Sequence, residues 1–552
     1  STPLYSSAAS DVYKRQEYKY SRIKSNNLGV LMTKGNLAIV LHAHLPYVRA
    51  EEPGSLEEDW FFQALAECYL PLLETLENAS RSKDQAPKIT IGLSPTLLSL
   101  LGDEVLKNRF EEWVTIRLEV LNTLETDCIK AVLHLKDHLK RQLESWKICQ
   151  GDLIGRFKKL QTLEVIDILT CAATHGYLPL LRENPEAVRA QLKTAVTEHK
   201  RLFMSAPLGI WLPECAYYEG LDELMAESGL RYAVLDGHGL LNADPRPRYG
   251  LYAPICTRKG VAFFGRDSES TLPVWSARDG YPGNPSYREF HRDLGWDLSI
   301  ENLKKIGING KRPLGIKLFK ITSQNTSLEN KQEYDPEAAN ESVEKDADNY
   351  LKERKKQLIK LEKSMQIEPL LIAPFDAELF GHWWFEGPKF LSHLFIKSKK
   401  EGIKLITLKE SLKLTPKIQL CNPSPSSWGQ GGFHNYWLNK SNAWIVNEWS
   451  KAGKAMVSIC SDGLIEESNI RIINQAGREL LLCQSSDWSF ILKAGTTTEL
   501  ARERINLHLK RFWMLINSIK NKKIINKKIL EKIEEEDCLF PLISLIDWKK
   551  KS

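Results

Sequence analysis

The sequence predicts an α/β fold in which parallel β-strands form a barrel, with a helical insertion and a C-terminal all-helical domain. Three observations lead to this prediction. Continuous apolar runs, typical of buried parallel strands, alternate with segments of helical periodicity. Residues 102–160 have helical patterns only and are rich in Leu, Glu and Lys. Beyond residue 415 the pattern is again mostly helical.

The first strand is expected in NLAIVLHAHLPYV, residues 36–48, which begins as a continuous apolar run. The segment 60–79 has the periodicity of a helix, and KITIGLSPTLLSLL (88–101) returns to a strand and a turn. Strand, helix and strand at this spacing are typical of a βαβ unit. Further strand segments of the same alternation are 163–181, 208–217, 232–241, 261–267 and 369–387.

The chain after these strands completes the expected organisation. KLITLKESLKL (404–414) is expected to be the last strand and helix of the barrel, and the polar stretch 322–348 a surface loop that leads into a helix. We assign the barrel to residues 35–101 and 161–414, the insertion to 102–160 and the C-terminal helical domain to 415–552. Residues 1–34 are predicted to be a disordered, artefactual extension, because STPLYSSAASDVYKRQ resembles translated sequencing-adapter sequence.

Composition and charge favour a globular enzyme without nucleic-acid or membrane partners. The 552 residues are 42% hydrophobic and 26% charged, and the net charge is only +6. The lysine runs near the C-terminus, at 520–533 and 549–551, are typical of a solvated helical face. We find no apolar run near the roughly 20 residues that span a bilayer. Ten cysteines without a CxxC pair indicate reduced thiols and a cytoplasmic protein, with no zinc site or disulfide framework.

Tryptophan is unusually abundant, and its neighbours suggest a use. The chain has 15 tryptophans, several of them beside glycine, asparagine or histidine. Packing explains most single tryptophans in proteins. Aromatic rings in polar clefts also serve carbohydrate sites, where they stack on sugar faces, and this number favours such a site.

Several of the predicted strands end in polar residues. In a barrel of parallel strands these ends share one face, where active sites lie. The residues concerned are His42, His44, His175, Glu214, Asp236, Asp376 and His382.

Two of these residues form a candidate catalytic pair. Glu214 stands in GIWLPECAYYEG and Asp376 in PFDAELFGHWWFEG, each at the end of an apolar strand. Burying a carboxylate there is costly unless it is used. Two carboxyl groups over one cleft are what glycoside chemistry needs, one at the anomeric carbon and one as acid and base.

Other interpretations of the same residues remain open. Either carboxylate alone could be a structural residue in a salt bridge. Cys215 could be a nucleophile, although packing at the strand end suits a small buried residue better. A metal site is a further alternative, because strand-end histidines two residues apart point to the same side. Its ligands would be His42, His44, Asp376 and His382.

Taken together, the motifs resemble those of glycoside hydrolase family 57 and, within it, of the 1,4-α-glucan branching enzymes. The resemblance extends from about residue 35 to about residue 520 and includes RELLLCQSSDWSFIL (478–492) of the C-terminal region. The other segments that carry it are HAHLPYVR (42–49), LTCAATHGYLPLL (169–181), WLPECAYYEGLDELMAESGLRYAVLDGHGLL (211–241), FGRDSESTLPVWSARDGYPGNPSYREFHRDLGWD (264–297), APFDAELFGHWWFEGP (373–388) and SSWGQGGFHNYWLNKSNAWI (426–445).

The resemblance implies an incomplete (β/α)7 barrel whose cleft is closed by the C-terminal helices, and a retaining mechanism without metal or cofactor. It implies that Glu214 is the nucleophile and Asp376 the general acid/base, with their carboxyl groups about 5–5.5 Å apart. The enzyme would cut an α-1,4 glucan bond and transfer the chain to a 6-hydroxyl, which makes an α-1,6 branch in glycogen or a starch-like polymer.

The resemblance also implies further residues that bind an α-1,4-glucan. His42, His44, His175, Trp211 and His382 would line the donor subsite, and Arg266 would also contact the substrate. Trp428 and Trp437 match aromatic positions that line the cleft, and Trp275 or Trp296 would add another platform. Asp487 in QSSDW is expected to reach the cleft from the helical domain. The partner would be the glucan alone, and the protein a monomer or homodimer.

Alternatives within the family and outside enzymes stay open. If water accepts the glycosyl group, the protein is an α-amylase. If a 4-hydroxyl accepts it, the protein is a 4-α-glucanotransferase. An inactive glucan-binding protein is a third possibility, against which the two carboxylates argue. Phe319 stands where the family commonly has histidine, EKDADNYL (344–351) also lacks a usual histidine, and VRAEEPG (48–54) is altered, so substrate details are open.

Overall fold

The first strand, β1 (Gly35–Ala43), is the longest strand of the sheet, and all nine of its residues are buried. The computed structural model describes residues 35–81, 86, 88–415, 417–461 and 465–550, which belong to one compact unit. The predicted disordered extension, 1–34, lies outside the described residues. For β1, burial on both faces is what its unbroken apolar run predicts, because parallel strands are covered on both sides.

Seven parallel strands form the barrel sheet, in the order β7-β5-β4-β3-β2-β1-β8. No ladder joins β8 to β7 among the described residues, although the Asp267 N–H that follows β7 donates to the Ile372 carbonyl at 2.9 Å. The sheet is therefore curled but not closed, which confirms the incomplete (β/α)7 barrel. The strands after β1 are β2 (Ile89–Leu93), β3 (Ile166–Cys171), β4 (Gly209–Trp211), β5 (Tyr232–Leu235), β7 (Ala262–Gly265) and β8 (Leu370–Asp376).

Three short strands extend this sheet. β9 (Ile403–Leu405) runs parallel to the first residues of β1, in the segment expected to be the barrel's last strand. β6 (Ile255–Cys256) lies antiparallel to β7, and β10 (Gln419–Leu420) pairs with β6.

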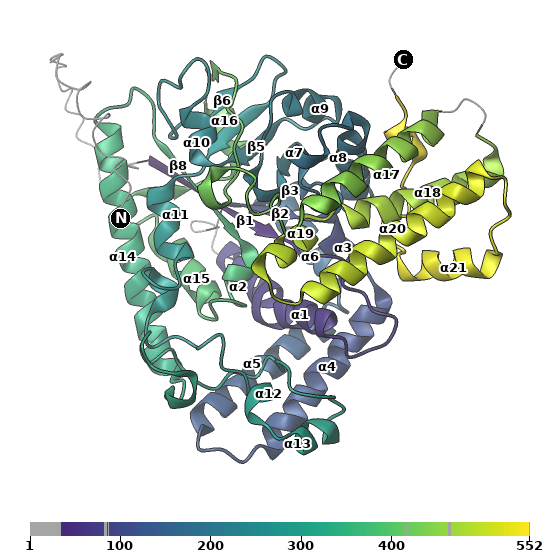
Figure 1. Ribbon diagram of the computed structural model, residues 1–552. Coiled ribbons are helices and arrows are strands. Elements are labelled where there is room, and N and C mark those ends of the chain that lie inside the picture. Colours follow the sequence, from purple (N-terminus) through teal and green to yellow (C-terminus); the bar gives the residue numbers. More distant parts are fainter. Residues whose placement is uncertain (1–34, 82–85, 87, 416, 462–464, 551–552) are drawn as a thin grey trace. The chain divides into compact units, whose positions relative to one another are not determined.

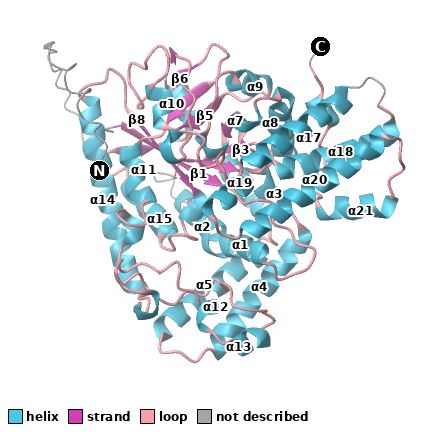
Figure 2. Ribbon diagram, viewed as in Figure 1, coloured by secondary structure: helices cyan, strands magenta, loops and turns pink. Residues whose placement is uncertain are grey.

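Helices pack around the sheet (Figures 1 and 2). Those of the barrel region are α1 (Leu56–Ala64), α2 (Leu70–Ser80), α3 (Pro95–Leu101), α7 (Leu178–Leu181), α8 (Pro185–Phe203), α9 (Leu221–Glu227), α10 (Gly237–Leu241), α11 (Ser268–Trp275), α12 (Leu294–Asp297), α13 (Ile300–Lys305), α14 (Pro336–Glu362), α15 (Gly387–Lys397) and α16 (Leu408–Leu414). A π-helical stretch, Leu65–Tyr69, joins α1 to α2. Among the described residues, no helix is both long and apolar enough to cross a membrane.

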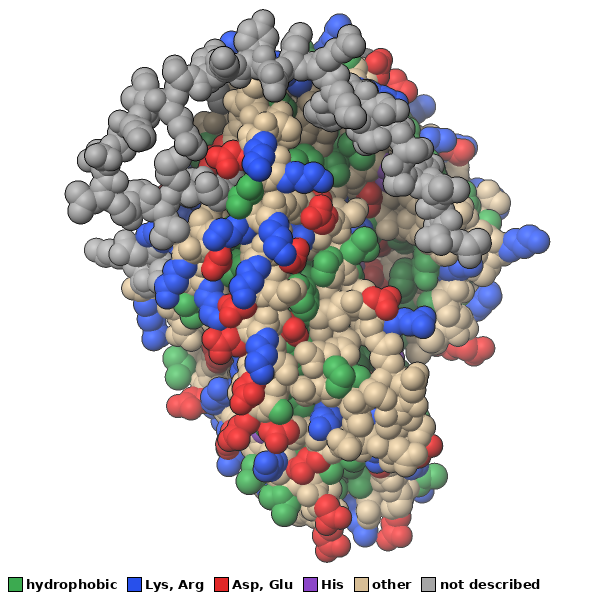
Figure 3. Space-filling view, turned by 90° about the vertical axis from the view of Figure 1, so that its left-hand side faces the viewer, with side chains coloured by type: hydrophobic (Ala, Val, Ile, Leu, Met, Phe, Trp, Pro, Cys, Tyr) green, Lys and Arg blue, Asp and Glu red, His purple; other side chains and the backbone are tan. Residues whose placement is uncertain are grey.

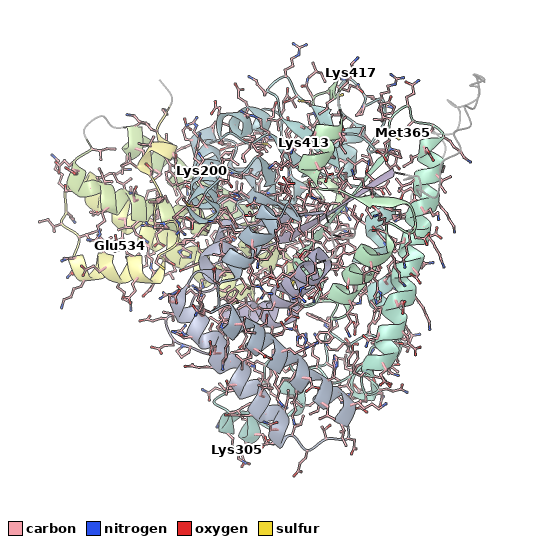
Figure 4. All side chains as sticks on the ribbon, turned by 180° about the vertical axis from the view of Figure 1, so that it is seen from behind. Lys200, Lys305, Met365, Lys413, Lys417 and Glu534 are labelled. Atoms are coloured by element: carbon pink, nitrogen blue, oxygen red, sulfur yellow. The ribbon has the colours of Figure 1, made fainter. Side chains whose placement is uncertain are left out.

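The insertion and the C-terminal region are helical, as their patterns predict. The insertion contains α4 (Glu104–Thr123), α5 (Ile129–Ile148) and α6 (Leu153–Thr162). The C-terminal helices are α17 (Ala443–Ser461), α18 (Glu467–Cys483), α19 (Ser486–Ala494), α20 (Thr498–Lys520) and α21 (Lys527–Glu536). Seen from behind, Glu534 of α21 and Met365, just beyond α14, lie at opposite sides (Figure 4). The C-terminal helices therefore lie on the side of the barrel away from α14.

The expected surface loop 322–348 is shorter in the structure, because α14 begins at Pro336. Asp335 caps the helix by accepting hydrogen bonds from the backbone N–H groups of Glu337 and Ala338, and proline suits the first helical position. Val343 and Ala347, four residues apart, are buried against the barrel. The polar residues of 336–348 lie on the other face of α14, where side chains of both charges are exposed (Figure 3).

Candidate active site

The candidate site lies where the parallel strands end. Asp376 is the last residue of β8 and pairs in register with His42 of β1. Glu214 follows β4, and His175 follows β3. The structure thus brings together polar residues from four strand ends, at the face where barrel active sites lie.

Glu214 is held in a strained turn. Its backbone has φ 61° and ψ 24°, the left-handed region that side chains other than glycine seldom adopt, and Cys215 has φ 49°. Such strain persists only where the surroundings enforce it, and it is frequent at functional sites. The indole N–H of Trp428 donates to Glu214 Oε2 at 2.7 Å, and the Trp428 backbone N–H donates to the Glu214 carbonyl at 3.0 Å.

Three histidines and one tryptophan stack along the ends of β1, β3 and β4. The His42 ring lies 4.7 Å from that of Trp211 at an interplanar angle of 8°. His44 stacks on His175 with 4.0 Å between ring centroids. Gly92 of β2 leaves the space for the stack, since a Cβ there would lie 3.1 Å from His42 Nδ1 and 3.3 Å from Trp211 Cβ.

The helix α19 reaches this face from the C-terminal region. Asp487 Oδ2 accepts a hydrogen bond from His44 Nε2 at 3.0 Å. The Ser486 hydroxyl lies 2.8 Å from His175 Nδ1 and donates to Glu214 Oε1 at 3.4 Å. Burial alone would raise the pKa of Asp487, but the charge and hydrogen bond of His44 outweigh burial and lower it to about 2.

Burial and neighbouring charges oppose the ionisation of both candidate carboxyls. Burial, with the charges of Asp376 and Asp487, raises the pKa of Glu214 to about 8, although the Trp428 hydrogen bond opposes this rise. Burial, and then the charge of Glu378, raise the pKa of Asp376 well above its usual range, against the opposing charge of Arg266. Both carboxyls therefore keep their protons to a higher pH than exposed carboxyls would.

Sequence reasoning did not identify Glu378, which lies two residues after Asp376. The Tyr69 hydroxyl donates to its Oε1 at 2.5 Å, and the His44 backbone N–H donates to the same oxygen at 3.1 Å. Burial raises the pKa of Glu378 to about 7. The sequence signal for Glu378 was a second acidic residue close to Asp376 in the same motif. Ser486 was also not identified, and the sequence held no signal for it.

His382 lies beside the site and faces another charged group. Its Nδ1 is 3.0 Å from Glu67 Oε2, and Arg288 forms an ion pair with Glu67 at 2.7 Å. Burial lowers the pKa of His382 in spite of Glu67. Glu67 therefore holds His382 in place. Tyr69, two residues after Glu67, donates to Glu378, so one short segment contacts both His382 and Glu378.

The predicted tryptophans fall into two groups. Trp428 lies at the centre of one group, with its ring 5.1 Å from Trp211 and 5.7 Å from Trp275. The Arg266 guanidinium is 5.8 Å from the Trp428 ring and ion-pairs with Asp236 at 3.4 Å.

The remaining two tryptophans differ from this group. Trp437 is buried and stacks on Tyr177 with ring centroids 4.5 Å apart. Trp296 is 50% exposed on α12. Figure 1 shows α12 near α4 and α5, below the strands, and no described contact of Trp296 reaches the carboxyls. Its role as a platform stays a prediction.

The metal alternative does not gather the four residues that the sequence suggested, since His382 is held by Glu67. Among the described residues of this face, the sets whose ligand atoms lie within 4.8 Å of one another are His42, Cys171 and His175, and His44, His175 and Asp487. Burial raises the pKa of Cys171 well above its usual range, which keeps the thiol neutral. His44 uses both ring nitrogens for Ser94 and Asp487. These contacts favour positioning over metal binding.

Buried carboxyls with indole rings at the open end of a parallel barrel fit the class of α/β-barrel glycoside hydrolases. The family model of glycosyl hydrolase family 57 matches residues 38–421, and that of the C-terminal region of 1,4-alpha-glucan branching enzymes matches residues 448–548. The chain belongs to glycosyl hydrolase family 57.

Individual relatives agree with this assignment. A 1,4-alpha-glucan branching enzyme of Thermococcus kodakarensis is 34% identical over 92% of this chain and 77% of its own length. The crystal structure of an alpha-amylase, AmyC, from Thermotoga maritima superimposes with a TM-score of 0.87 and 35% identity, over 94% of this chain and 100% of that one. A branching enzyme of this family from Pyrococcus horikoshii gives a TM-score of 0.84 and 30% identity, over 94% and 97%.

Proposed function

We propose that this protein is a 1,4-α-glucan branching enzyme. The observation that carries the proposal is that α19 supplies Ser486 to Glu214 and Asp487 to His44. This helix belongs to the region that the C-terminal family model of branching enzymes matches. The relatives named as branching enzymes support the same function.

The reaction is a double displacement with retention. Glu214 attacks C1 of an α-1,4-linked glucosyl unit while Asp376 gives its proton to the departing 4-oxygen, and a covalent glycosyl-enzyme forms. Asp376 then takes the proton of a 6-hydroxyl on another chain as that oxygen attacks C1. The ester to Glu214 breaks, an α-1,6 branch forms, and both carboxyls return to their starting states.

One hydrogen bond and the charges around the pair support different protonation states for the two carboxyls. An indole N–H can only donate, so the 2.7 Å contact from Trp428 favours an ionised Glu214. The proton that the first step needs is then held by Asp376, whose pKa burial and Glu378 raise. Burial still raises the pKa of Glu214, but a neutral Asp376 no longer adds to that rise. One carboxylate is ready to attack and one acid is ready to donate, as the first step requires.

The substrate in this proposal is an α-1,4-glucan such as amylose or a glycogen- or starch-like polymer. His42, His44, His175, Trp211, Arg266, Trp275, Trp296, His382, Trp428, Trp437 and Asp487 would bind it or position the residues that do. All ten cysteines are free, which supports a reducing, cytoplasmic location. The protein would act as a monomer or homodimer, with the catalytic barrel and the helical domain divided near residue 415.

A second candidate is an α-amylase, favoured by the likeness to the Thermotoga maritima protein of that title. It would use the same two carboxyls, with water in place of the 6-hydroxyl. Access of water to the glycosyl-enzyme would decide between the two outcomes.

Proton NMR of amylose incubated with the protein, with a count of reducing ends, separates these functions. Branching would give new α-1,6 anomeric signal with few reducing ends. Many reducing ends without α-1,6 signal would move the function to hydrolysis. The Glu214→Gln variant is the control, and should give neither product.

A further inference from the structure

Two aromatic rings stack on each other near the cleft and remain partly open to solvent. The rings of Tyr436 and Phe490 have centroids 5.0 Å apart at an interplanar angle of 20°. Phe490 is 44% exposed, whereas the neighbouring Trp437 is only 2% exposed. We call Tyr436 and Phe490 the rim pair.

Phe490 lies on the face of α19 that reaches the catalytic residues. Ser486 and Asp487 contact Glu214 and His44, and Phe490 follows them by four and three residues. Residues three and four apart in a helix lie on the same face, about one turn, or 5.4 Å, along the axis. Phe490 therefore continues the face that Ser486 and Asp487 present to the cleft.

Tyr436 comes from the other element that reaches Glu214. It lies in the loop between β10 and α17, which also carries Trp428, the residue that donates to Glu214. The adjacent Trp437 packs on Tyr177, so the loop is anchored beside Tyr436. Each ring of the rim pair thus stands on an element already fixed to the nucleophile.

A ring that only filled the interior would be buried, as Trp437 is. The rim pair instead keeps flat apolar surface in water beside the polar residues of the candidate site, and an aromatic side chain offers such surface with few rotatable bonds. The C–H faces of glucosyl units are flat and apolar, with hydroxyls around their edges. An α-1,4-glucan chain is therefore the occupant that suits both the rings and the adjoining site.

We infer that the rim pair is a stacking platform for an α-1,4-glucan chain that extends beyond the reacting sugars. The inference rests on the proposed function and adds to it a subsite outside the catalytic centre. A platform outside the subsites of the reacting bond contributes more to the binding of long chains than to the binding of short ones. It would also influence the length of the chain that is transferred.

Binding to the unreactive Glu214→Gln parent tests the platform without turnover. In this background, Phe490→Ala and Tyr436→Ala should each weaken the affinity for maltoheptaose about fivefold in titration calorimetry, from the usual value of one aromatic contact. The affinity for maltotriose should change by less than about twofold by the same reasoning. Phe490→Trp should restore maltoheptaose binding, because it restores a ring.

Ile148→Ala is the matched control, since Ile148 is 78% exposed on α5 and should leave both affinities unchanged. Unchanged maltoheptaose binding by both alanine variants overturns the platform. A dimer in the parent that becomes a monomer in Phe490→Ala, measured by sedimentation, also overturns it, because the rings would then contact a second copy. If the Glu214→Gln parent binds no glucan, the result refutes the proposed function as well as the platform.

Discussion

Two groups of buried carboxylates and histidines among the described residues can be compared, one at the candidate active site and one among the C-terminal helices. In the second group, His508 Nδ1 lies 2.8 Å from Glu479 and 3.7 Å from Asp537. Arg511 forms an ion pair with Asp537 at 2.5 Å. The residue types are those of the cleft, but here positive charge balances the acids within the group.

The two groups differ in how well their polar atoms are satisfied. No buried side-chain polar atom of Glu479, His508 or Asp537 lacks a hydrogen-bond partner among the described residues. In the cleft, both ring nitrogens of His42 and Nε2 of His175 have none. His175, with φ 55°, and Glu214 also have left-handed backbones, whereas Glu479 and His508 lie in regular helices.

The contrast separates stability from function. Removing one partner from a satisfied group destabilises the fold, because the remaining charge is then buried alone. Unsatisfied donors and backbone strain cost stability and are retained where a ligand or a reaction uses them. Burial and charge alone would not distinguish the two groups, since burial also raises the pKa of Glu479 to about 7.

The largest effect is expected in the cleft. Glu214→Gln and Asp376→Asn should each lower the branching rate by at least about 10⁴-fold, because each removes a group that acts in the reaction. Neither should lower the melting temperature, because each keeps the size of the side chain and removes a carboxyl whose ionisation burial opposes. Iodine staining of amylose and calorimetric unfolding measure the two effects. Full activity in either variant would refute the mechanism.

The helical group should respond in the opposite way. His508→Leu leaves Glu479 and Asp537 facing each other and should lower the free energy of unfolding by about 3 kcal/mol. The rate per folded molecule should stay within about twofold of the wild type, because strained and reacting groups are elsewhere. Denaturant unfolding and activity at low temperature test both. Adding Glu479→Gln to His508→Leu should recover part of the lost free energy of unfolding. A His508→Leu variant that is fully stable but slow would contradict the distinction between the two groups.

A smaller effect should separate two tryptophans of one loop. Trp428→Phe removes the donor to Glu214 and should raise the pKa of that carboxyl, which moves the acid limb of the pH–activity profile upward by about one unit. Trp437→Phe is the matched control, because Trp437 Nε1 has no partner among the described residues and its stacking on Tyr177 is kept. Equal profiles for the two variants would show that the Trp428 hydrogen bond does not control Glu214.

The strand ends were predictable, and most contacts between them were not. Apolar runs that stop at His42, Glu214 and Asp376 define both the barrel and its active face, because burial on both sides of a parallel strand leaves a clear pattern. Ser486 donates to Glu214 over a separation of 272 residues, and no local pattern reports such a contact. The prediction that Asp487 reaches the cleft rested on the family resemblance alone.

Other features were hidden for local reasons. The start of α14 was missed because its exposed face is as polar as a loop, and only the cap at Asp335 followed by proline distinguishes it. Glu378 was missed because it follows Asp376 so closely that one acidic residue seemed sufficient to explain the motif. Its contacts with Tyr69 and His44 appear only when β1, β8 and the π-helical turn are packed together.

Glu378 offers the finest test of the comparison, since it is an acid of the cleft that does not reach the reacting bond in the proposed mechanism. Its charge raises the pKa of Asp376, second only to burial. Asp376 must hold a proton to act as the acid, so activity falls as pH rises through the pKa of Asp376. Glu378→Gln keeps an acceptor for Tyr69 but removes the charge, and should move the alkaline limb of the profile down by about 0.5–1 unit. The acid limb, which reports Glu214, should stay in place.

Tyr69→Phe, which keeps the charge of Glu378, is the control, and its alkaline limb should move less than that of Glu378→Gln. An alkaline limb unchanged in Glu378→Gln would mean that burial alone keeps Asp376 protonated.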